Sequence, residues 1–159
     1  MSRQRTESFS VRTSAPEETG RFGAALGARL EAGMCVALVG ALGAGKTTLV
    51  RGMCRALGVD EEILSPTFIL YEVFAGRYPV VHVDLYRLEH EAELEALGVF
   101  DLPGGDAVLL AEWGDRSEAL LARADVVVEI RAAAGEAREI VVHATRQAMG
   151  KLGEARAWS

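Results

Sequence analysis

The sequence has few of the residues that mark secreted, membrane-spanning or metal-cluster proteins. It contains only two cysteines, Cys35 and Cys54, too few for a disulfide framework, and its three histidines lack metal-ligand spacing. No apolar run approaches the length of a membrane span, and the polar start MSRQRTESFS has no signal-peptide core. We therefore expect a protein of the reducing cytoplasm without membrane contact.

Lysine is also scarce, and the charge balance is acidic. Two lysines, Lys46 and Lys151, stand beside fifteen arginines, and the net charge is −6. An acidic chain is atypical of a general nucleic-acid binder, although a local arginine patch remains compatible with it. Half of the residues are hydrophobic and a quarter are charged. This composition and the length of 159 residues indicate one globular domain with a real core.

Apolar periodicity and turn signals predict an α/β fold with a mixed, mostly parallel sheet and helices on both faces. The expected strands are 9–13, 34–40, 67–74, 78–84, 107–113, 125–130 and 138–145, and the expected helices are 14–30, 46–57 and 89–98. Ser14 is the predicted N-cap of the first helix, and a hairpin is expected around Gly135. We expect residues 1–7 to be flexible, 8–149 to form the domain and 150–159 to be a tail.

Another hairpin is predicted in the middle of the chain. Only residues 75–77 separate two strand-like runs, and so short a link forces antiparallel pairing. Pairing about Gly76 would place Thr67 opposite Leu85, and Phe68 opposite Asp84. The segment SPTF, residues 65–68, would then enter the sheet beside Asp84. It is either a switch that senses a γ-phosphate or an ordinary turn before a strand.

The run GALGAGKT, Gly40–Thr47, fits the phosphate-binding P-loop pattern in full. Its glycines let backbone N–H groups approach phosphate oxygens, and the following helix adds its positive end. Lys46, which we expect to be an exposed loop residue, would reach the β- and γ-phosphates, and the Thr47 hydroxyl can ligate magnesium. Lysine stands here in an arginine-rich chain, where a compact ammonium suits the site better than a planar guanidinium.

Two apolar strands end in a carboxylate, Asp84 in VVHVD and Glu112 in VLLAE. If both strands run parallel to the one before the P-loop, the acids lie beside the loop, where a magnesium nucleotide needs them. The alternative is that each acid caps a neighbouring turn. His82 is either a polar partner of this site or a satisfied core histidine. Trp113 either lines the nucleotide or partner surface or packs in the core.

The sequence resembles one family in particular. The motifs GALGAGKTTLVRG, SPTF, HVDLYRL and AEW occur in the order and spacing of the bacterial TsaE (YjeE) ATPases, and the resemblance covers residues 8–150. It implies a single P-loop NTPase domain that uses ATP and Mg2+. It also implies a partnership with the TsaD and TsaB proteins, which install threonylcarbamoyl on adenosine 37 of tRNA. A TsaE protein would hydrolyse ATP to support their turnover and touch tRNA only through the complex.

The resemblance also implies roles for individual residues. Phosphate contacts would come from the glycine loop and the helix that follows it, at Gly43, Ala44, Gly45, Lys46, Thr47 and Thr48. Thr47 and Glu112 would ligate magnesium, and Asp84 would order water or metal-bound solvent. Thr67 belongs to the switch-like segment. Further nucleotide contacts are implied at Ser14 and Glu18 of the first helix and at Arg138 of the last hairpin.

Two other classes share the P-loop. A small-molecule kinase needs an acceptor pocket and usually a lid carrying arginines, and no insertion of lid size follows the hairpin. Arg87 or Arg116 alone would make a thin lid. A nucleotide-dependent binding module with negligible hydrolysis is the other alternative. The guanine-reading N-K-x-D tetrapeptide is absent, which favours ATP over GTP. We expect the isolated protein to be a monomer.

Overall fold

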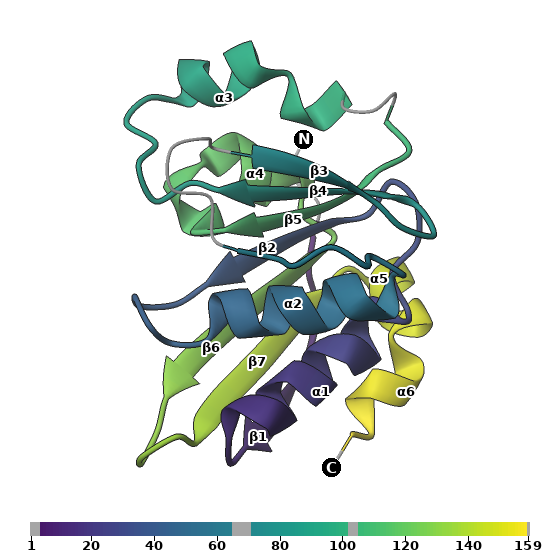
Figure 1. The fold of residues 1–159 in the computed structure, drawn as a ribbon, viewed down its shortest axis with the longest axis vertical. Helices are drawn as coiled ribbons and strands as arrows, with labels where there is room; N and C mark the ends of the chain where they lie inside the picture. Colours follow the sequence, from purple (N-terminus) through teal and green to yellow (C-terminus); the bar gives the residue numbers. More distant parts are fainter. Residues whose placement is uncertain (1–3, 65–70, 102–104, 159) are drawn as a thin grey trace.

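The structure is a computed structural model that describes residues 4–64, 71–101 and 105–158. Seven strands form one sheet in the order β1-β7-β6-β2-β5-β4-β3 (Figure 1). Their bounds are β1 Glu7–Thr13, β2 Cys35–Val39, β3 Tyr71–Ala75, β4 Pro79–Asp84, β5 Val108–Glu112, β6 Val126–Ala132 and β7 Arg138–Ala144. The central strands β6, β2, β5 and β4 run parallel, and antiparallel strands flank them on both sides. The predicted mixed, mostly parallel α/β fold is therefore confirmed.

Helices cover the sheet on both faces. The α-helices are α1 Pro16–Gly27, α2 Lys46–Ala56, α3 Glu91–Leu97, α4 Glu118–Arg123, α5 Arg146–Lys151 and α6 Gly153–Arg156, and short 3-10 turns occur at Val99–Asp101 (η1) and Gly114–Arg116 (η2). Alternate residues of β2 serve two cores: Val36 and Leu38 pack under α1 and α2, whereas Cys35 and Ala37 pack under α3 and α4. Burial on both faces explains why β2 reads as an unbroken apolar run. None of the helices among the described residues is long and apolar enough to cross a bilayer.

The two hairpins test the predicted registers. In the β6–β7 hairpin Val126 pairs with Ala144 and Ala132 pairs with Arg138, so the pairing centres on Gly135 as predicted. In the β3–β4 hairpin Ala75 pairs with Pro79, so the pairing centres on Arg77 and not on Gly76.

The predicted register of the first hairpin was therefore wrong by two residues. The Arg77 N–H donates to the Leu57 carbonyl at 2.6 Å, and a Cβ at Gly76 would lie 2.6 Å from the same oxygen. The turn is thus seated on the end of α2, and this long-range contact fixes its position. Thr67 and the rest of the segment 65–70 lie outside the described residues.

The ends of the chain differ from the expectation of loose segments. Residues 150–159, predicted as a tail, include the end of α5 and all of α6, and Leu152 and Ala155 are buried. The Trp158 ring packs edge-on against Phe22 of α1, with 5.4 Å between ring centroids. At the other end, strand β1 already begins at Glu7, and the Arg5 guanidinium donates to two backbone carbonyls at the C-terminal end of α4, those of Leu121 and Ala124.

The first helix starts one residue later than predicted. Its N-cap is Ala15, not Ser14, and no side chain caps it. Instead, the Ser14 N–H donates to the Glu18 carboxylate at 3.3 Å. Pro16 favours the start of the helix because its fixed φ is already helical. The acids in the first turn also favour it, because their negative charge interacts with the positive end of the helix.

Candidate functional site

The glycine loop joins the end of β2 to the start of α2. Gly43 and Gly45 have φ values of 77° and 113°, a left-handed backbone that residues with a Cβ rarely adopt. Gly45 is also the N-cap of α2, and it offers no side chain to occupy the N–H groups of the first turn. These N–H groups and the positive helix end together form an anion-binding corner.

Lys46, the first residue of α2, is buried and only 5% exposed, so the expectation of an exposed lysine was wrong. Its ammonium donates to the carbonyls of Gly40 at 2.6 Å and Ala41 at 2.8 Å. The Trp113 ring covers the same Nζ atom, 4.0 Å from the ring centroid. Burial lowers the Lys46 pKa, and the nearby Glu112 carboxylate acts in the opposite direction.

The two predicted acids lie side by side because β4 and β5 are parallel to β2, with Asp84 and Glu112 as direct register partners. Glu112 is 3% exposed, and its Oε1 accepts a hydrogen bond from the Thr47 hydroxyl at 2.8 Å. The Asp84 Oδ1 accepts from the Tyr86 N–H at 2.9 Å. Burial raises the Asp84 pKa, and the negative charge of Glu112 adds to this effect.

This corner suits a magnesium ion. Thr47 and Glu112 present two oxygen atoms 2.8 Å apart, and oxygen is the donor that Mg2+ prefers. The negative charge of Glu112 helps to raise the Asp84 pKa, and a bound divalent cation would offset that repulsion. The residues that are present therefore fit the metal that the motifs imply.

An aromatic wall closes one side of the site. Trp113 has a left-handed backbone, with φ 59°, which is unusual for a bulky residue and turns the chain directly after Glu112. Its ring lies 5.0 Å from the Tyr86 ring, and the Arg116 guanidinium lies over both rings. Trp113 lines the cleft and also packs against the core on the α3 and α4 side of the sheet, so its nucleotide contact stays a prediction.

These residues enclose a cavity of about 300 Å³. The lining residues are Leu42, Gly43, Gly45, Lys46, Thr47, Thr48, Asp84, Tyr86, Glu112 and Trp113. Sequence reasoning missed Leu42 and Tyr86. Tyr86 follows Asp84 by two residues within HVDLYRL, so its position in that motif was the available signal.

Four other predicted contacts do not line the cavity. Ala44 is buried beneath the loop, and its carbonyl accepts from the Arg138 Nε at 2.8 Å. Arg138, which lies on β7, therefore stabilises the P-loop backbone through this hydrogen bond. Ser14 and Glu18 bond to each other at the start of α1. Their predicted nucleotide contacts, like the role of Thr67 outside the described residues, stay predictions.

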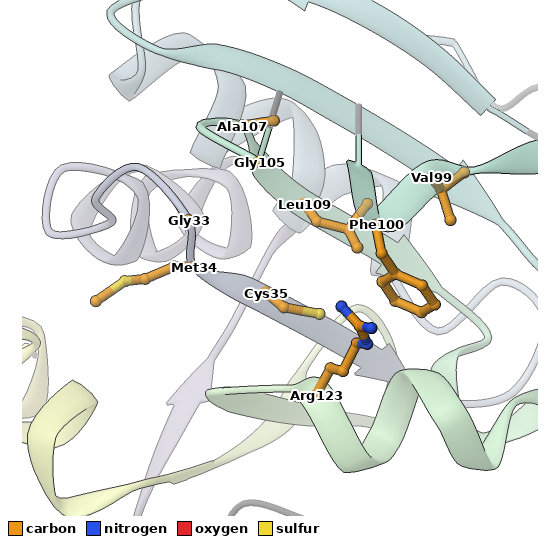
Figure 2. A pocket seen from close by; sticks show the side chains of 9 residues that line it. All are labelled: Gly33, Met34, Cys35, Val99, Phe100, Gly105, Ala107, Leu109 and Arg123. Carbon is orange, nitrogen blue, oxygen red and sulfur yellow. The ribbon is translucent and has the colours of Figure 1, made fainter. Parts of the chain in front are cut away.

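A second, smaller cavity lies at the opposite end of β2 and β5 (Figure 2). Figure 2 shows the Arg123 side chain reaching from α4 toward Phe100, and its guanidinium lies 4.2 Å from the ring centroid. The volume is about 80 Å³, far below that of a typical small-molecule pocket. No residue of the P-loop cleft contributes to it, and we assign it no part in the site.

A P-loop between a parallel strand and a helix, with two strand-end carboxylates beside it, defines a protein of the P-loop NTPase class. A family model described as "Threonylcarbamoyl adenosine biosynthesis protein TsaE" matches residues 13–140. The chain belongs to the TsaE family.

Individual relatives agree with the family match. The chain is similar to the tRNA threonylcarbamoyladenosine biosynthesis protein TsaE of Treponema pallidum, with 40% identity over 79% of this chain and 93% of the relative. It is also similar to the TsaE protein of Bacillus subtilis, with 38% identity over 81% of each chain. Among solved structures it is similar to the crystal structure of Bacillus subtilis YdiB, with a TM-score of 0.79, 28% identity and 95% of each chain covered.

Proposed function

We propose that this chain is a magnesium-dependent ATPase that supports the biosynthesis of threonylcarbamoyladenosine in tRNA. The observation that carries the proposal is the contact of the P-loop residue Thr47 with Glu112, beside Asp84 and below the phosphate-binding corner. Family membership and the names of the relatives support the pathway. Hydrolysis would serve the turnover of the transferase formed by TsaD and TsaB.

We assign separate roles in hydrolysis to polar residues of the cleft. Phosphate oxygens would replace the carbonyls of Gly40 and Ala41 as partners of the Lys46 ammonium. Thr47 and Glu112 would hold magnesium, which supplies positive charge against the β- and γ-phosphates. Oδ1 of Asp84 is engaged by the Tyr86 N–H, so we assign its second oxygen to orienting the attacking water.

We expect Glu112→Gln to weaken ATP binding in the presence of magnesium and to spare binding without metal. The amide keeps the shape of the carboxylate but lacks its charge, so the affinity gained from magnesium should fall about tenfold or more. Titration calorimetry with and without magnesium measures this gain.

Glu129→Gln is the matched control, because Glu129 is also paired with a histidine, His143 at 2.9 Å, but on β6 outside the cleft. The Glu129→Gln variant should gain as much affinity for ATP from magnesium as wild type does. If Glu112→Gln and wild type show the same affinity across a magnesium titration, Glu112 is not part of the metal site.

We further propose that the protein works in the cytoplasm, is a monomer when isolated, and acts with TsaD and TsaB. The exposed side chains of Leu42 and Tyr86, 77% and 44% exposed, stand at the mouth of the cleft, where a partner can cover them. The net charge of −6 agrees with tRNA contact through the partners and not directly.

Partner dependence is measurable with purified components. Because the cleft is open at its mouth, we expect slow phosphate release from ATP by the chain alone and faster release with the TsaB–TsaD pair. Binding of the pair should in turn be tighter with ATP than without it. Equal release rates with and without the pair would contradict a partner-completed site.

A further inference from the structure

His82 is a buried polar side chain in a strand whose other residues are apolar up to the final Asp84. Its neighbours in β4 are Val80, Val81 and Val83, and all four residues are 0% exposed. A fourth valine would satisfy the packing of such a strand without any polar atom to desolvate. Burying the imidazole therefore has a desolvation cost, and packing alone does not explain why a histidine stands at this position.

One ring nitrogen of His82 has a single strong partner. Its Nε2 lies 2.6 Å from Oε2 of Glu112, which projects from the adjacent strand β5. The other nitrogen, Nδ1, has no hydrogen-bond partner among the described residues. Buried polar atoms are nearly always paired, so an unpaired Nδ1 is unfavourable. The bond between Nε2 and Glu112 is the polar interaction that offsets this cost and holds the ring in place.

The Glu112 carboxylate is consequently held at both ends. Oε2 is bonded to His82 and Oε1 accepts from the Thr47 hydroxyl, so the three side chains form one line from β4 through β5 to α2. His82 is fully buried and Glu112 is only 3% exposed, so water cannot replace the bond at Oε2 without opening the core. Losing His82 would leave Oε2 buried without its partner and the carboxylate free to rotate.

We propose that His82 is a positioning residue for Glu112: it binds Oε2 and thereby keeps Oε1 directed at the magnesium position beside Thr47. This inference rests on the proposed function, because it assigns His82 to the metal side of the same cleft. Histidine–carboxylate pairs commonly orient the groups around a metal, and loss of such outer partners typically costs 10- to 100-fold in metal affinity.

The test compares the affinity for the ATP analogue AMP-PNP with and without magnesium, by titration calorimetry. We expect the affinity gained from magnesium to fall about tenfold or more in His82→Leu, with little change in binding without metal. His82→Gln can still donate a hydrogen bond to Oε2 and should keep most of the gain. A purely structural role would lower the melting temperature of His82→Leu without changing the ratio of the two affinities.

Two further variants make the comparison specific. His143→Leu removes a histidine from the similar pair with Glu129 and should leave the magnesium gain at the wild-type value. In the Glu112→Gln background, adding His82→Leu should cause no further loss, because His82 acts only through Glu112. These equilibrium measurements need no hydrolysis.

The outcomes separate the inference from the proposed function. If wild type gains no affinity from magnesium, the proposed magnesium site fails, and the role of His82 fails with it. If wild type gains affinity and His82→Leu gains as much, only the positioning role is overturned. Independent, additive losses in the double variant would also overturn it, whereas loss in His82→Leu with rescue in His82→Gln supports it.

Discussion

Replacing Lys46 by alanine is expected to lower ATP hydrolysis by about 10²–10³-fold, the usual effect of removing one charge-stabilising group from a transition state. The ammonium lies at the start of α2, at the bottom of the cleft, where phosphate oxygens can replace its two carbonyl partners. No other lysine or arginine lines this cavity among the described residues. Phosphate release from ATP, with and without the TsaB–TsaD pair, measures the loss.

The chain offers a matched control for this variant. Its other lysine, Lys151, forms an ion pair with Glu31 on the surface, and Lys151→Ala should hydrolyse ATP as wild type does. Because Lys46 is buried, Lys46→Ala also leaves two carbonyls without their ammonium, at a cost of about 1 kcal/mol. The variant should still unfold cooperatively. Loss of cooperative unfolding, or hydrolysis at the wild-type rate, would contradict the assignment.

Replacing Gly52 by alanine is expected to cause a large loss of stability. Gly52 lies on α2 at its contact with α1, and a Cβ there would stand 2.1 Å from the Gly20 carbonyl and 2.9 Å from the Ala24 N–H nitrogen. Both atoms belong to the backbone of α1, so the helices must separate. Overpacking of this kind costs about 3 kcal/mol. The melting temperature should fall by about 6–12 °C.

Gly150→Ala is the control for Gly52→Ala. Gly150 lies in helix α5, and a Cβ there would meet no atom within 4 Å. Alanine should therefore leave stability unchanged or raise it by up to about 1 kcal/mol, through helix propensity. Thermal unfolding followed by circular dichroism compares both variants. If Gly52→Ala is as stable as Gly150→Ala, the close contact of α1 with α2 does not hold.

The sequence was sufficient to predict those parts of the fold that depend on local patterns. The central strands β2 and β5 follow from their apolar runs, and the β6–β7 register follows from the turn at Gly135. The β3–β4 register was missed because its turn is positioned by Leu57, which lies outside the hairpin. The C-terminal helices were missed because their four to six residues are stabilised by packing, α5 beside β7 and α6 on α1, and not by their own periodicity.

The candidate site, too, was predicted from the sequence only in part. The loop motif and the rule that parallel strands end at one edge predicted that Thr47, Asp84 and Glu112 come together. The burial of Lys46 and the bond between His82 and Glu112 depend on side chains that approach across strands, which spacing alone does not specify. The close contact of Gly52 with Gly20 was missed for the same reason.

The central proposal, that this cleft binds magnesium and ATP, is tested most directly by the fluorescence of Trp113. The chain has two tryptophans, and Trp158→Phe leaves Trp113 as the only one. The Lys46 ammonium lies on the Trp113 ring, so binding of phosphate to this ammonium would change the surroundings of the ring. Titration of Trp158→Phe with AMP-PNP and magnesium should therefore give a saturable change with one site per chain, and no such change once Lys46→Ala is added. No change at millimolar AMP-PNP, or the same change with Lys46→Ala, would contradict a nucleotide site in this cleft.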